Sequence, residues 1–332
     1  MDREFLHYLK DKKEVSLRYD AYTEAVWVYG KPEKCPCLNI SMLQELHETQ
    51  TGLIDYFRHH DMKPKTPVKF FVYASQIPDI FSLGGDVETI YSVAKNQKRE
   101  KMEQCAKLAI KAMHLNFTNF GLPIHTLALV EGDAMGGGFE KALSFGKIIA
   151  EEQSRFGLQQ MRFNMLPGSG IYSFLVRMVG PRYADEIITQ TKIYSAQEMH
   201  EMGAVSVVAR KGEGKKEVDR YLRQYKKSFR AMQALEKAKL RYAPFPFSEL
   251  EYMAELFVNT IMGLDRLDLK MLQKLAESQE KNTAEISHRL RTKQDRRFVH
   301  PDPHGPIVDA AGNPVAKDRR KNPDPRTSHG TS

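Results

Sequence analysis

The chain has 332 residues, of which 41% are hydrophobic and 28% charged. This composition is ordinary for a globular protein and excludes collagen, coiled coil and wholesale disorder. The longest apolar runs fall far short of the roughly 20 residues that span a bilayer, and the charged first five residues lack the apolar core of a signal peptide. We therefore expect a cytoplasmic protein that does not bind membranes.

The formal net charge is +8, and most of the excess is local. Residues 211–241 hold eleven basic and four acidic side chains, which is typical of a solvated helix face or of a docking patch for an acidic partner. We do not predict nucleic-acid binding. The thiols of Cys35, Cys37 and Cys105 are expected to be reduced and structural. His300 and His304 could touch a metal but lack further ligands, so we predict no metal and no cofactor.

Hydrophobic periodicity predicts alternating strands and helices in the first half of the chain. In chain order the sequence predicts antiparallel strands at 14–19 and 21–29 that meet at Asp20 and Ala21, a helix at 40–57, a buried strand at 68–74, a long helix at 87–117, a strand at 126–130, and a short helix around Glu140.

The second half continues this alternation and then becomes purely helical. We predict strands at 147–150 and 204–209, helices at 170–179 and 183–189, and two helical segments after residue 215, divided at 243–246 and ending near 291. Such alternation argues for a layered α/β fold. The predicted parts are an α/β core at 1–214, a helical oligomerisation region at 215–293 and a disordered tail at 294–332.

Two glycine turns are the strongest functional signal. They read FSLGGD at 81–86 and GDAMGGGFE at 132–140, and each comes between a strand and a helix. Glycines there let the backbone approach a ligand, and a helix start presents free N–H groups. Two such turns facing each other would form an oxyanion hole. Tight packing of helix on strand, without a ligand, is the alternative for either turn alone.

These segments resemble the crotonase (enoyl-CoA hydratase) superfamily, in order and spacing, across about residues 65–210. Further matches are FGL at 156–158, LPGSG at 166–170 and YSAQE at 194–198. Within the superfamily, the segments at 73–81 and 132–140 are most similar to synthases of diffusible signal factors, the cis-2-unsaturated fatty acids of bacterial quorum sensing. The resemblance implies a spiral of ββα units followed by a helical region that builds a homotrimer.

The resemblance also implies roles for individual residues. It places the oxyanion N–H groups at Leu83 and Gly137, and the first catalytic glutamate at Glu140. A carboxylate in an apolar pocket can act as a proton shuttle, although Glu140 could also simply complement the helix dipole. The substrate-binding glycines implied are Gly84, Gly85, Gly136, Gly138 and Gly168. Ser169 is expected to cap the helix that follows it.

The chain departs from the family at the second catalytic glutamate. Gln160 stands at that position, and Gln159 stands where the family has a proline. An amide cannot exchange a proton near neutral pH, so hydration or dehydration by two carboxylates is in doubt. Three outcomes are open: isomerisation or thioester hydrolysis by Glu140 alone, slow dehydration with water as the acid, or a protein that binds an acyl ligand or a signalling partner without catalysis.

By resemblance, the expected substrate is a fatty-acyl thioester of an acyl carrier protein or of coenzyme A. The basic residues at 211–241 would suit an acidic carrier protein. The reaction expected is of the dehydratase or thioesterase type used in signal-factor synthesis.

Overall fold

The computed structural model describes residues 3–292. Contacts group Met1–Glu285 into one compact unit and Ile286–Ser332 into a second, and the description below concerns the first. The division predicted at residue 214 stays a prediction. The tail at 294–332, with His300 and His304, lies outside the described residues. Within the part described, no helix is both long and apolar enough to cross a membrane.

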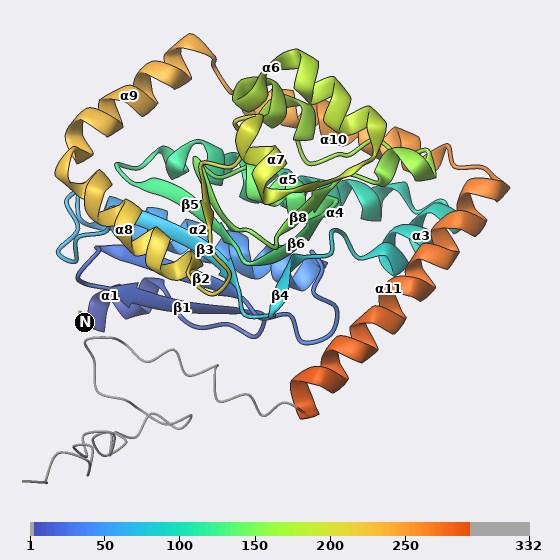
Figure 1. The fold of residues 1–332 in the computed structure, drawn as a ribbon, viewed down its shortest axis with the longest axis horizontal. Helices are drawn as coiled ribbons and strands as arrows, with labels where there is room; N and C mark the ends of the chain where they lie inside the picture. The colour runs from blue at the N-terminus through green and yellow to red at the C-terminus, as the bar shows by residue number, and fades with distance from the viewer. Residues whose placement is uncertain (1–2, 293–332) are drawn as a thin grey trace, which may run out of the picture. The chain divides into compact units, whose positions relative to one another are not determined.

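The larger sheet has six strands, which lie in the order β1, β2, β3, β5, β7, β10. Figure 1 shows β1, β2, β3 and β5 of this sheet. They are β1 (Val15–Asp20), β2 (Ala25–Gly30), β3 (Phe70–Ser75), β5 (His125–Val130), β7 (Lys147–Glu151) and β10 (Val207–Ala209). Only β1 and β2 pair antiparallel, as predicted, although four residues rather than a tight turn separate them. The other neighbours pair parallel.

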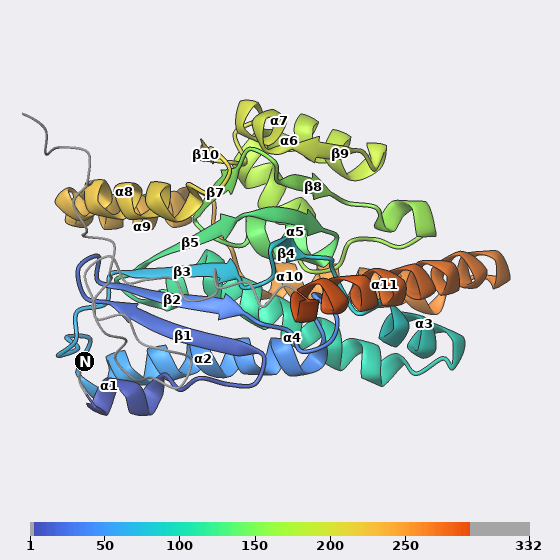
Figure 2. The same ribbon diagram turned by 60° about the horizontal axis from the view of Figure 1, so that its bottom comes forward.

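A smaller sheet has four strands in the order β4, β6, β8, β9. They are β4 (Asp79–Ser82), β6 (Gly132–Met135), β8 (Arg155–Gly157) and β9 (Ile193–Ser195). Three times in succession the chain adds one strand to the larger sheet and the next to the smaller one, as β3 then β4, β5 then β6, and β7 then β8. This repeated ββα progression, seen from a second side in Figure 2, confirms the predicted crotonase-like α/β fold.

Helices cover both sheets and form the C-terminal part. They are α1 (Arg3–Tyr8), α2 (Ile40–His59), α3 (Val87–Lys95), α4 (Arg99–Phe117), α5 (Gly137–Leu143), α6 (Ile171–Gln190), α7 (Ala196–Glu201), α8 (Gly214–Lys227), α9 (Phe229–Tyr242), α10 (Phe247–Met262) and α11 (Arg266–Thr292), with short 3₁₀ segments at Asn119–Gly121 and Gln160–Phe163.

Two helix predictions need correction. The helix predicted over 87–117 is divided into α3 and α4, because the chain between them turns through Gln97, whose φ is +51°. The two helices predicted at 170–179 and 183–189 lie end to end as α6, with a kink at Gly180, whose φ is +80°, followed by Pro181. Proline cannot donate the helical hydrogen bond, which explains the kink there.

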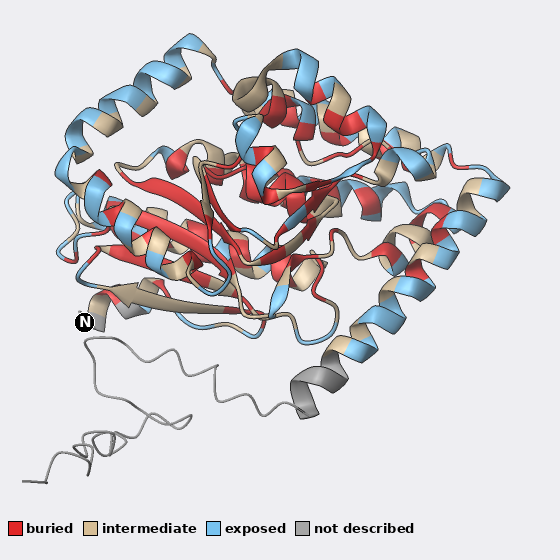
Figure 3. Ribbon diagram, viewed as in Figure 1, coloured by how far each residue is buried: buried red, intermediate tan, exposed pale blue. Residues whose placement is uncertain are grey.

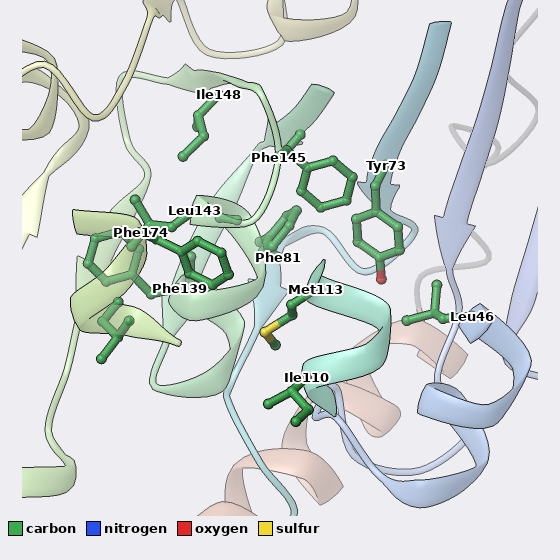
Figure 4. Close-up of a cluster of buried hydrophobic side chains, with 14 of the residues drawn as sticks. Leu46, Tyr73, Phe81, Ile110, Met113, Phe139, Leu143, Phe145, Ile148 and Phe174 are labelled. Atoms are coloured by element: carbon green, nitrogen blue, oxygen red, sulfur yellow. The ribbon is translucent and has the colours of Figure 1, made fainter. Parts of the chain in front are cut away.

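The strand β3 shows how the core divides into two layers. Phe70 and Val72 face α8, where they join Tyr225, while Phe71 and Tyr73 face the larger cluster on the opposite side. The alternation follows from the two-residue period of a strand whose faces are both covered. Buried residues accordingly run along the central strands in Figure 3, and Figure 4 shows Tyr73 beside Phe145 in the larger cluster. The rigid core fixes the strand ends that carry the site.

Candidate active site

The two glycine turns meet at one edge of the smaller sheet. Because β4 and β6 are parallel neighbours, the turns that follow them lie side by side. A Cβ on Gly84 would lie 3.0 Å from the carbonyl oxygen of Met135 and 3.5 Å from the nitrogen of Gly137. Gly84 and Gly136 also have φ values of +96° and +50°, a region that favours glycine. The sequence therefore permits a backbone contact that other side chains would prevent.

One of the two predicted oxyanion donors is not available. The N–H of Leu83 donates at 2.7 Å to the carbonyl of Pro36, so the assignment of Leu83 needs correction. The carbonyl of Gly84 accepts from the N–H of Leu38 at 2.7 Å. The Gly84 carbonyl and the Gly85 N–H belong to the same trans peptide, in which the C=O and N–H bonds point in opposite directions. The Gly85 N–H therefore points away from Leu38.

Gly85 and Gly137 each supply an N–H group at this edge. Neither N–H donates to any of the residues described. A Cβ on Gly137 would lie 3.6 Å from the nitrogen of Gly85, so the two groups are close together. Gly137 begins α5, where the first N–H groups lack partners within the helix. The pair can bind one oxygen atom that carries negative charge.

The remaining predicted glycines have two different roles. Gly168 lines the same cavity as Gly84, Gly85 and Gly136, and a Cβ on it would lie 2.2 Å from Cγ of Phe257 on α10. Gly138 does not line the cavity. A Cβ there would lie 2.6 Å from Cβ of Ser82, so this glycine allows α5 to pack closely on β4.

Glu140 lies one turn into α5 and is only 2% exposed. Its Oε2 accepts from the backbone N–H of Ser169 at 2.5 Å. Burial raises the pKa of Glu140 to about 7, although the hydrogen bonds from Ser169 and Ile171 oppose the shift. A carboxyl group with this pKa can both take and give a proton near neutral pH.

The predicted role of Ser169 as helix cap is wrong, because Gly170 is the N-cap residue of α6.

Gln160 lies beside Glu140. Its Nε2 donates to Oε1 of Glu140 at 3.3 Å, while its Oε1 is buried and has no partner among the described residues. The other acid that lines the cavity is Asp86, whose two oxygens accept from the N–H and hydroxyl of Thr89 at 3.3 and 2.7 Å. Asp86 therefore caps α3 and does not replace the missing second glutamate.

These residues open into a cavity of about 290 Å³, at the lower end of the usual range for small-molecule sites. Its wall is mainly apolar and comes from α2, α3, α4, α10, α11 and the loop before α6, with the side chains of Leu43, Ile90, Met102, Ala106, Ala109, Met165, Phe257 and Leu275. Such a wall suits a hydrocarbon chain. No described residue of α8 or α9, which carry most of the basic segment, lines it.

Sequence reasoning missed two groups at this site. The Ser169 N–H is a backbone donor, so no side-chain pattern reveals it. Gln279 of α11 reaches the turn after β4 from 194 residues away. No set of three or more His, Cys, Asp or Glu side chains among the described residues could hold a metal ion.

Comparison with solved structures agrees with this fold. A solved enoyl-CoA hydratase from Bacillus halodurans superposes with a TM-score of 0.66 over 79% of this chain and 100% of its own, at 20% identity. The solved structure of Pseudomonas aeruginosa DspI superposes with a TM-score of 0.58 over 76% of this chain and 96% of its own, also at 20% identity. Likenesses at this level of identity show the fold.

Sequence comparison extends the likeness to a family. The mitochondrial methylglutaconyl-CoA hydratase of Rattus norvegicus is 30% identical over 147 residues, which are 44% of this chain and 44% of that protein. The match thus spans less than half the length of this curated relative. The family model for enoyl-CoA hydratase/isomerase matches residues 43–293, about three quarters of the chain. The chain therefore belongs to the enoyl-CoA hydratase/isomerase family.

Proposed function

We propose that the protein moves a proton at carbon 2 of a fatty-acyl thioester, with Glu140 as the base and Gly85 and Gly137 as the oxyanion donors. The observation that carries this proposal is Glu140 itself. It is a buried carboxyl group with a pKa of about 7, and it lines an apolar cavity together with two free N–H groups. The N–H pair stabilises the oxygen on which charge develops when the proton leaves.

The reaction that fits a single carboxylate is isomerisation of a 3-enoyl thioester. Glu140 takes the proton from carbon 2, and the electrons of that C–H bond delocalise onto the thioester oxygen, which Gly85 and Gly137 bind. Glu140 then returns the same proton to carbon 4, and the double bond becomes conjugated with the thioester. This sequence needs no second acid and no further reactant.

Gln160 supports a second candidate, a protein that binds an acyl thioester without turning it over. An amide hydrogen-bonded to Glu140 at 3.3 Å can hold a hydroxyl group but cannot protonate a departing one. Dehydration would then depend on water as the acid. The cavity alone would suffice for a role in binding an acyl ligand or in signalling.

The finer parts of the proposal rest on the sequence resemblance. They are synthesis of a cis-2-unsaturated signal, an acyl carrier protein or coenzyme A as the thioester, and a homotrimer built by residues 215–293. A cytoplasmic location is a separate proposal, which rests on the apolar pattern of the sequence and not on the resemblance. A carrier protein docked on the basic residues at 211–241 would not meet the cavity wall, because no residue of α8 or α9 forms part of it. We therefore do not place the docking site of the thioester carrier on that basic segment.

The test compares three proteins on four substrates. Wild type, Glu140→Gln and Glu131→Gln are incubated with 3-enoyl, 2-enoyl, 3-hydroxyacyl and saturated acyl thioesters, each on coenzyme A and on carrier protein. Glu131 is a matched control, because burial also raises its pKa to about 7 while it does not line the cavity. Ultraviolet absorbance follows the conjugated product, mass spectrometry follows loss of water or hydrolysis, and calorimetry follows binding.

We expect conjugation of the 3-enoyl thioester by wild type and by Glu131→Gln, and none by Glu140→Gln. Equal turnover by Glu140→Gln would refute the role of Glu140. Tight acyl binding by wild type without turnover of any substrate would favour the binding protein instead.

A further inference from the structure

Helix α11 sends one side chain to the turn between β4 and α3. Nε2 of Gln279 donates to the carbonyl oxygen of Gly85 at 3.1 Å, and Oε1 of Gln279 accepts from the N–H of Val87 at 3.0 Å. A single amide thus binds an acceptor and a donor of the backbone on either side of Asp86. Gln279 is half-buried and lines the cavity.

The turn is held at its other end by a different segment. Pro36 and Leu38 bind the N–H of Leu83 and the carbonyl of Gly84, each at 2.7 Å. These two bonds hold the backbone as far as the Gly84 carbonyl, and Gln279 holds it from the Gly85 carbonyl to the Val87 N–H, so the peptide that carries the Gly85 N–H lies between two anchored segments. Two consecutive glycines leave this backbone few steric limits of its own.

We infer that Gln279 is a positioning residue that holds the Gly85 N–H in the direction required to bind the thioester oxygen. This inference rests on the proposed function, because it assigns the oxygen of an acyl thioester to that N–H group. An oxyanion donor helps only when it is aimed beforehand at the developing charge. The helix α11 therefore lines the cavity and, through the side-chain amide of Gln279, also orients one of the oxyanion donors.

A merely structural role for Gln279 would be to attach α11 to α3. Gln273 allows the two roles to be separated, because it lies on the same helix and its Oε1 accepts from the hydroxyl of Tyr91 on α3 at 3.1 Å. Gln273 does not line the cavity and makes no hydrogen bond to the turn. Replacing either glutamine by methionine keeps the length of the side chain and removes both polar ends.

The experiment measures the carbonyl stretch of a saturated acyl-CoA, labelled with ¹³C at the thioester carbon, by infrared difference spectroscopy. Wild type, Gln279→Met and Gln273→Met are compared. We expect binding to wild type and to Gln273→Met to lower the carbonyl frequency. The lowering should be at most half as large in Gln279→Met, while the dissociation constant changes less than about threefold, since the apolar wall contributes most of the binding.

Kinetics provide the second readout if wild type turns over a 3-enoyl thioester. Gln279→Met should lower kcat about 10- to 100-fold with little change in KM, a smaller loss than the 10²- to 10³-fold for removing an oxyanion donor outright. Gln279→Glu serves if the methionine variant does not fold. It keeps the acceptor for Val87 and loses the donor for Gly85, so an intermediate carbonyl shift is expected.

The outcomes separate this inference from the proposed function. An undiminished carbonyl shift in both Gln279 variants would overturn the inference alone. A shift that is smaller in the Gln279 variants than in wild type, together with no turnover by wild type, would support the inference and refute the enzymatic proposal. If wild type binds the thioester without lowering its carbonyl frequency, the N–H pair does not bind that oxygen, and both are overturned.

Discussion

Gln160→Glu is expected to give the site the second carboxyl group that it lacks. The amide nitrogen of Gln160 lies 3.3 Å from Oε1 of Glu140, so the new carboxyl group would lie within hydrogen-bonding reach of the first. Two carboxylates so close together cannot both be ionised, and the pair therefore holds a shared proton near neutral pH. That proton is available to a hydroxyl group leaving carbon 3, while the ionised partner takes the proton from carbon 2.

The expected rate increase in Gln160→Glu can be estimated from what a positioned general acid contributes to catalysis. General acid catalysis commonly contributes about 10²- to 10⁴-fold, which corresponds to about 2.7–5.5 kcal/mol of activation free energy. We therefore expect at least a hundredfold faster interconversion of 3-hydroxyacyl and 2-enoyl thioesters.

The assay follows the absorbance of the conjugated 2-enoyl thioester as it forms or is hydrated. Gln159→Glu is the matched control, since Gln159 also lines the cavity but makes no hydrogen bond to Glu140. A rate in Gln160→Glu equal to that of wild type, with acyl binding retained and with Gln159→Pro added, would refute the view that a missing acid limits the reaction.

Two further predictions concern stability. Lys141 is 3% exposed, its Nζ has no hydrogen-bond partner among the described residues and lies 3.2 Å from the ring centroid of Tyr73, and burial holds its pKa well below the ordinary 10.5. Because the pKa is lower in the folded chain than in the unfolded one, the free energy of unfolding should rise as the pH approaches 10.5 from below. Lys141→Met should flatten that rise and add about 1–3 kcal/mol to the free energy of unfolding in urea titrations at pH 7. An unchanged pH slope in this variant would contradict the lowered pKa. Gly168→Ala should cost about 1–3 kcal/mol, because its Cβ would lie 2.2 Å from Phe257, while Gly263→Ala, with its nearest neighbour at 3.4 Å, should cost less; equal losses in thermal unfolding would contradict this.

The pattern of apolar residues in the sequence predicted strands of the larger sheet but none of the smaller one. Strands such as β3 are six residues long, and their continuous apolar sequence is typical of a sheet covered on both faces. The strands β4, β6, β8 and β9 have only three or four residues, and β6 begins with Gly132 and Asp133, which favour turns. These strands exist because their neighbours pair with them, and local sequence carries little of that information.

Some residues of the site could be predicted from local sequence motifs, whereas others depend on contacts between segments far apart in the chain. Glu140 and Gln160 lie near each other because each follows a strand of the same sheet, β6 and β8 respectively. Leu83 was misassigned because its N–H is engaged by Pro36, 47 residues earlier in the chain. Gln279 carries no signal of its own, since a glutamine on a long amphipathic helix is typical of a solvent-exposed face.

The central claim is that Glu140 exchanges a proton with carbon 2 of a bound acyl thioester, and hydrogen exchange tests it without any second catalytic group. A saturated acyl-CoA is incubated in D₂O with wild type, Glu140→Gln or Glu131→Gln, and deuterium at carbon 2 is measured by mass spectrometry. The account predicts that wild type and Glu131→Gln introduce deuterium and that Glu140→Gln does not. Equal exchange by all three proteins, or none by a wild-type protein that binds the thioester, would contradict it.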